Sequence, residues 1–290
     1  MRAIRSLYIC AVVVVSACAT LVASGAPLQT INVSVGEVSD NRSTGSFGSE
    51  CKLELKFTGD AASDAAAVRQ VRVKTAIDDL GRDLSRNDSQ ETSHSFNSGQ
   101  RNGVLKTELR LRNPSRNANT IKLLEGEIEL FSPTTANGGV LTVKDILKHP
   151  AEPVQNEALK KYGVELVYLT KESYEAKKKQ LQEQQNSGAD GKLGEAFGDL
   201  FKGMFGGTLA SDSKNSVKLY VKDPEKRVVD VEFQDASGNA LKTGSSWTMG
   251  EMRQIEFKSA PPPDAQLQIH LATPEALRTF VFKAEKVPLP

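Results

Sequence analysis

The chain has 290 residues, with 37 Lys and Arg against 36 Asp and Glu and a hydrophobic content of 39%. This near-neutral balance argues against a nucleic-acid-binding domain, and interleaved charge at that hydrophobic content argues against intrinsic disorder. The length suits two domains better than one.

The first residues have the layout of an export signal. A basic start is followed by the continuously apolar Leu7–Val15 and then by a stretch of small residues. We predict a signal peptide at 1–25, because Ala23 and Gly25 place small side chains at positions −3 and −1 of the cleavage site. The protein is then expected in the periplasm, at the cell surface or in the extracellular space.

Two other outcomes remain open for this segment. Val15-Ser16-Ala17-Cys18 resembles the lipobox of bacterial lipoproteins, in which the cysteine becomes the acylated N-terminus, so Cys18 is a candidate lipidation site. Against this, the apolar run continues past Cys18, where a polar tether is usual. An uncleaved Ser6–Ala26 is also long enough to span a membrane as a helix.

Cys51 is the one cysteine that remains after cleavage at Gly25, so no internal disulfide is expected. It alternates with apolar residues in the segment CKLELKF. We therefore interpret Cys51 as a buried small hydrophobe rather than as a reactive nucleophile.

Alternating apolar residues predict strands through both ends of the mature chain. Turn-rich segments separate these runs, which resemble immunoglobulin and fibronectin type III modules in general. We expect a mainly β protein with two immunoglobulin-like β-sandwich domains, at 26–140 and 214–290. The expected strands centre on residues 31–35, 51–57, 71–73, 105–111, 124–130, 217–221, 229–233, 255–257, 267–271 and 280–282.

A faint internal repeat connects the two halves. The segments 71–84 and 228–241 share the pattern D-x-x-G-x-x-L after a strand. A duplicated sandwich would produce this pattern, and so would two unrelated hairpins.

Residues 141–213 are expected to form a helical and flexible insert between the domains. A capping-box pattern at Thr142–Asp145 predicts a short helix, and 156–162 predicts another. Val164–Leu169 is expected to be a strand. Thr170 is then placed to cap a long polar helix at 171–185, which has too little apolar surface to be buried along its length.

The segment 191–206 predicts an amphipathic helix with one apolar stripe. Its several glycines lower its intrinsic stability, so it needs a partner surface. The stripe either covers its own domain or docks to a membrane surface or a partner. The residues of the stripe are Leu193, Phe197, Leu200, Phe201, Met204 and Phe205.

Catalytic and metal-binding patterns are weak. The histidines His94, His149 and His270 lie in different segments, without metal-ligand spacing, and no nucleophile elbow, P-loop or dinucleotide fingerprint occurs. We expect neither a cofactor nor a metal. The acidic segment 78–88 is interpreted as a turn containing ion pairs rather than as a calcium loop, and Trp247 is a weak sign of carbohydrate binding.

These observations favour an exported, non-catalytic binding or assembly protein of the cell envelope or extracellular space. Its partner is an unidentified protein or envelope component, with membrane-surface contact through 193–205 as an option and no nucleic acid. The alternatives are an envelope hydrolase with an unrecognised site, or a carbohydrate- or calcium-binding module.

Overall fold

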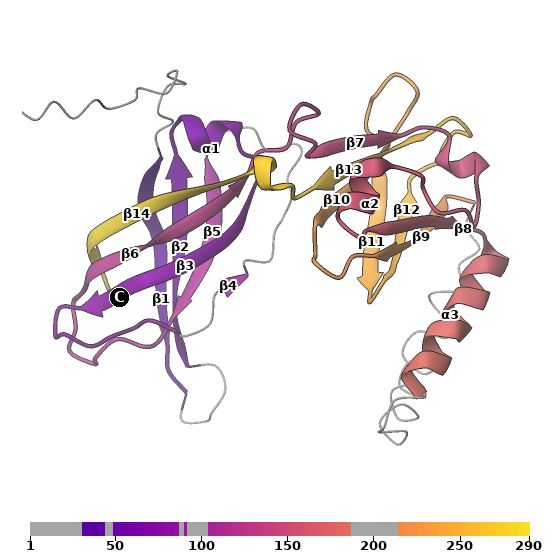
Figure 1. Cartoon of the computed structure of the whole chain (residues 1–290). Coiled ribbons are helices and arrows are strands. Elements are labelled where there is room, and N and C mark those ends of the chain that lie inside the picture. Colours follow the sequence, from indigo (N-terminus) through magenta and orange to yellow (C-terminus); the bar gives the residue numbers. More distant parts are fainter. Residues whose placement is uncertain (1–30, 44–48, 87–89, 92–103, 187–213) are drawn as a thin grey trace, which may run out of the picture.

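The computed structural model describes residues 31–43, 49–86, 90–91, 104–186 and 214–290. Over these residues the protein is mainly β, as expected, with antiparallel strands in four sheets. Figure 1 shows two groups of strands side by side, here named unit 1 and unit 2. None of the described helices has the length and apolar character needed to cross a membrane.

Unit 1 contains two sheets, with strand orders β1-β2-β5 and β14-β6-β3-β4. A short helix, α1, connects β2 to β3. The bounds are β1 Asn32–Asn41, β2 Glu50–Thr58, α1 Asp60–Asp64, β3 Ala67–Asp78, β4 Gln90–Glu91, β5 Leu105–Leu111, β6 Thr120–Phe131 and β14 Leu277–Pro288.

Unit 2 contains the other two sheets, with strand orders β10-β13-β7 and β11-β12-β9-β8. The strands are β7 Val140–Val143, β8 Glu165–Leu169, β9 Ser216–Lys222, β10 Val228–Gln234, β11 Thr243–Met249, β12 Met252–Phe257 and β13 Gln266–Leu271. The helices are η1 Ile146–Lys148, α2 Glu157–Lys161 and α3 Lys171–Asn186, and η2 Pro274–Ala276 precedes β14.

Each unit has one main hydrophobic core between its two sheets. In unit 1, alternate residues of β2 face inward and are completely buried, which follows directly from the period-two pattern of that segment. In unit 2, Phe233 of β10 meets Phe257 of β12 edge to face, with ring centroids 5.5 Å apart. The cores are therefore built from the alternating residues that the sequence indicates.

The expected domain boundaries differ from the strand pairing in three places. The last strand, β14, pairs with β6 of unit 1 along its whole length, so residues 277–288 do not belong with the expected domain 214–290. Strand β8 and all of β7 except Val140 lie inside the expected insert 141–213, yet β7 and β8 pair with β13 and β9 of unit 2. Alternation shows that a segment is a strand, but it does not show which sheet edge the strand joins.

The capping-box expectation at Thr142–Asp145 is wrong. Leu141 and Val143 alternate toward the core of unit 2, and strand β7 forms there. Asp145 then adopts a left-handed conformation, with φ 55°, and only the three-residue η1 follows. Pairing of β7 with β13 outweighs the local helix signal.

The expected polar helix is present as α3, which projects away from the strands in Figure 1. Thr170 accepts a hydrogen bond from the N–H of Ser173 at 3.3 Å, so the predicted cap is confirmed. Tyr174 is buried against Tyr220 and Met252, and it attaches the first turn of α3 to the outer face of the β9–β12 sheet.

The repeated turn pattern has the same hydrogen bonds in both units. Asp78 and Asp235 each accept the backbone N–H groups two and four residues ahead of them. Gly81 and Gly238 adopt φ values of 87° and 84°, which favour glycine. The leucine that ends each pattern donates its N–H to the strand before the turn, at 2.7 and 2.8 Å.

Candidate functional site

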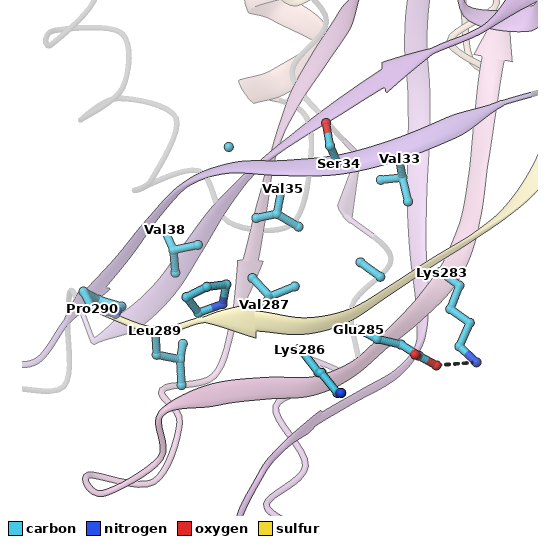
Figure 2. Close-up of a pocket in the computed structure, with 13 residues that line it drawn as sticks. Val33, Ser34, Val35, Val38, Lys283, Glu285, Lys286, Val287, Leu289 and Pro290 are labelled. Atoms are coloured by element: carbon cyan, nitrogen blue, oxygen red, sulfur yellow. Dashed lines mark ion pairs between the residues drawn. The ribbon is translucent and has the colours of Figure 1, made fainter.

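A groove in unit 1 separates two strands that lie at the edges of facing sheets. Among the described residues, β1 pairs only with β2, and β14 pairs only with β6. The two edge strands run side by side in the same direction and enclose a volume of about 710 Å³ (Figure 2). Each strand therefore has one edge without a ladder partner in the described structure.

The floor of the groove is apolar. Val35 of β1 and Val287 of β14 point toward one another across it in Figure 2. Val33, Val38 and Leu289 are partly buried and pack against the core of unit 1. The hydrophobic core is thus open to solvent at the groove. Apolar side chains of another molecule can be buried there.

A β-bulge interrupts β1 between Val35 and Val38. A Cβ at Gly36 would lie 2.5 Å from Glu54 Oε1 and 2.7 Å from Lys56 Cε, so the ends of these two flexible side chains would have to shift. The bulge divides β1 into two regularly paired parts, residues 32–35 and 38–41. Such an interruption protects an edge strand from indiscriminate pairing.

Charged side chains line the outer side of β14. Lys283 Nζ lies 2.8 Å from Glu285 Oε1, as Figure 2 marks. The hydrogen bond from Lys283 lowers the pKa of Glu285, and the same bond raises the pKa of Lys283. Lys286 follows with a left-handed φ of 52°. The site combines an apolar floor with a charged rim.

The residues predicted for docking and lipidation lie outside the described residues. These are Cys18 and the apolar stripe at Leu193, Phe197, Leu200, Phe201, Met204 and Phe205. The signal segment and His94 also lie outside. The roles of Cys18 and of the apolar stripe therefore remain predictions.

Cys51 is fully buried in the core of unit 1. Burial, assisted by the charge of Asp40, raises the pKa of its thiol to about 11. The thiolate is disfavoured, and the interpretation of Cys51 as a buried hydrophobe is supported.

The other two histidines lie in different environments. His149 is exposed and its Nδ1 lies 3.3 Å from Glu152 Oε2. His270, which alternates with Ile269 and Leu271 on β13, is only 6% exposed. The imidazole lies on the face of β13 opposite the core. Because β13 is flanked by β10 and β7, this side chain is nevertheless buried, and the burial lowers the pKa of His270 to about 4.

Asp230 lies directly opposite His270 on the neighbouring strand. Burial raises the pKa of Asp230, while the N–H of Val231 and the charge of Arg253 oppose that shift. The imidazole Nε2 of His270 contacts Gln268 Oε1 at 3.1 Å, and Asp230 forms an ion pair with Arg253 at 3.7 Å. Gln268 and Arg253 are thus the side chains that contact His270 Nε2 and the Asp230 carboxylate, respectively.

The acidic turn uses its central carboxylate internally. Asp78 is completely buried, and its oxygens accept the N–H groups of Leu80, Arg82 and Ser115 at 2.8–3.0 Å. Burial alone would raise the pKa of Asp78, but these hydrogen bonds outweigh it and hold the pKa below its usual value. Within the described residues, no group of three or more potential metal ligands is present.

Alternation in 31–35 correctly predicted β1, but no local pattern indicated the groove. Its second wall comes from β14, far away in the chain.

Comparisons with protein-family models, curated proteins and solved structures find no match for this chain.

Proposed function

We propose that this chain is an exported, non-catalytic binding or assembly protein of the cell envelope or extracellular space. The proposal includes two immunoglobulin-like β-sandwiches, and it is supported by a core between two sheets in each unit. Export rests on the signal pattern at 1–25. Mass spectrometry of the mature N-terminus tests that part, with a start at Ala26 or an acylated Cys18 as the supporting results and a start at Met1 as the contradicting one.

The observation that carries the binding role is the groove between β1 and β14. Its occupant in this proposal is an extended segment of a partner protein with apolar side chains at every second position. Such a segment would pair its backbone with the edge of β1 that has no ladder partner among the described residues, and it would place alternate side chains in the groove against Val35 and Val287. This mode uses the two properties of the groove, an edge without a ladder partner and an apolar floor.

A peptide library tests this binding mode directly. The probes are nine-residue peptides with Val, Ile or Leu at alternate positions, and the controls are the same compositions in scrambled order. We expect only the alternating peptides to bind, with new hydrogen-exchange protection at the amides of β1. Failure of every alternating peptide to bind contradicts the proposal.

A matched pair of variants locates the bound peptide. Val33→Asp places a charge on the apolar floor and is expected to abolish binding, whereas Asn32→Asp adds the same group at an exposed neighbour outside the groove. Circular dichroism checks that both variants fold. Binding that survives Val33→Asp in a folded protein rules out this groove as the site.

The predicted amphipathic segment offers a second contact in the same proposal. Deleting 191–207 is expected to leave the melting temperature nearly unchanged and to abolish association with liposomes or with the partner. A large loss of stability would show instead that the stripe belongs to the core.

A further inference from the structure

The two units repeat one order of strand pairing. In unit 1, β2 lies between β1 and β5, and β3 pairs with β6. In unit 2, β9 lies between β8 and β12, and β10 pairs with β13. Strands β1, β2, β3, β5 and β6 therefore correspond, in chain order, to β8, β9, β10, β12 and β13. The matching turns after β3 and β10 support this correspondence, whereas β4 and β11 join different sheets in the two units.

The strands that follow β6 and β13 break the symmetry of a simple tandem repeat. After β6 the chain leaves unit 1, and β7 pairs with β13 in unit 2. After β13 the chain leaves unit 2, and β14 pairs with β6 in unit 1. Both pairings are antiparallel. Since β6 corresponds to β13, β7 and β14 are equivalent strands that have changed places.

The two crossing segments, 132–139 and 272–276, contact each other between the units. Thr273 Oγ1 donates a hydrogen bond to the carbonyl oxygen of Asn137 at 2.8 Å. The N–H of Ser132 donates to the carbonyl oxygen of Ala276, also at 2.8 Å. A separate buried apolar cluster lies at this junction, made of Ala67, Phe131, Ala272 and Ala276.

We infer that the two units are interlocked by a reciprocal exchange of their equivalent final strands. Among the described residues of 31–131, only β3 pairs with β6, and β14 from the other end of the chain fills its second edge. Likewise, among the described residues of 164–271, only β10 pairs with β13, and β7 from the first half fills its second edge. Separating the units therefore requires a strand to leave a sheet, and not only a surface contact to be broken.

Cleavage of one crossing segment distinguishes this arrangement from two adjacent domains. A protease recognition site is inserted between Thr135 and Ala136, in an exposed turn of the first crossing, in the chain that begins at Ala26. After cleavage, β14 on the second fragment still pairs with β6 on the first. We expect the fragments to co-elute at the intact size in native buffer and to separate in denaturant. Separation into two folded species in native buffer overturns the inference.

Variants on β14 show whether that strand holds the cleaved fragments together. Phe282→Ala removes a buried ring from the core of unit 1, and association of the fragments is expected to weaken on the order of a hundredfold. Val281→Thr changes the exposed neighbour on the same strand and should leave association unchanged. Equal association of the Phe282→Ala and Val281→Thr fragments overturns the inference.

Two natural probes give a second measurement on the uncut chain. Trp247, the single tryptophan, lies in unit 2, and Cys51, the single cysteine after Ala26, lies in unit 1. For interlocked units, tryptophan fluorescence and thiol accessibility should report one coincident unfolding transition. Phe282→Ala should shift both midpoints together. A Trp247 transition that Phe282→Ala leaves in place would show independent units and overturn the inference.

Discussion

The ring of Phe282, on the last strand, packs edge-on against the ring of Phe57, on the second strand, with centroids 5.9 Å apart and an interplanar angle of 80°. Gly126 lies directly opposite Phe282 on β6 and leaves room for the ring. An aromatic ring that covers a strand glycine in this way stabilises a sheet that the glycine alone would weaken. The final strand thus completes the core of unit 1.

Gly126→Ala should destabilise unit 1. The added Cβ would approach the carbonyl oxygen of Arg72 and lie 2.8 Å from the Phe282 ring, so the strands or the ring must move. We expect a loss of about 1–3 kcal/mol in the free energy of unfolding, measured by denaturant titration. Gly244→Ala is the control, because its nearest contact is an ordinary 3.5 Å, and a similar loss in both variants would contradict this reasoning.

Asp78→Asn should destabilise the protein more than Asp235→Asn, although the two turns share one pattern. Asp78 is buried, and its charged carboxylate accepts three backbone N–H groups. Replacing it with the neutral amide of Asn should therefore lower the free energy of unfolding by roughly 2–3 kcal/mol. Asp235 makes comparable bonds at the surface, where water replaces them. The measurement is the unfolding free energy at pH 7, and equal losses would refute the role of burial.

His270 should make stability depend on pH. Its folded pKa of about 4 lies below the unfolded value of about 6.5, so the stabilisation is complete above pH 6.5 and is lost as pH falls toward 4. This contribution of His270 to the free energy of unfolding is at most roughly 3 kcal/mol. His270→Gln should flatten the profile of unfolding free energy between these limits. An unchanged slope in His270→Gln contradicts the prediction.

Cys51 should resist thiol reagents while the protein is folded. Its side chain is buried, and its pKa of about 11 leaves almost no thiolate at pH 8. In the chain that begins at Ala26, labelling by a chromogenic disulfide should become complete only with denaturant, at the unfolding midpoint. Stoichiometric labelling within minutes in native buffer would show that the thiol is accessible.

Local patterns predicted the elements better than the architecture. The alternation in CKLELKF correctly gave both β2 and the burial of Cys51, and Thr170 correctly marked the start of α3. Strand β11 was missed because TGSSWTM, at a sheet edge with mostly exposed side chains, has no apolar alternation. Helix α1 was missed because five residues between two strands carry little periodic signal.

The groove could not be predicted because it depends on which edge each strand joins. Phe280 and Phe282 indicated a strand, and the nearest partner in sequence was β13. The chain pairs that strand with β6 instead, which brings Val287 to face Val35. A period-two pattern does not specify which sheet edge a strand joins. The packing of Phe282 over Gly126 does favour pairing with β6.

Both ends of the described chain belong to unit 1, because β1 begins there and β14 ends there. Tension applied between the two ends would therefore pull along parallel neighbouring strands and load unit 1 in shear. Unit 2 would not lie between the two points at which the force is applied. Force applied between β1 and β14 would therefore be resisted by unit 1.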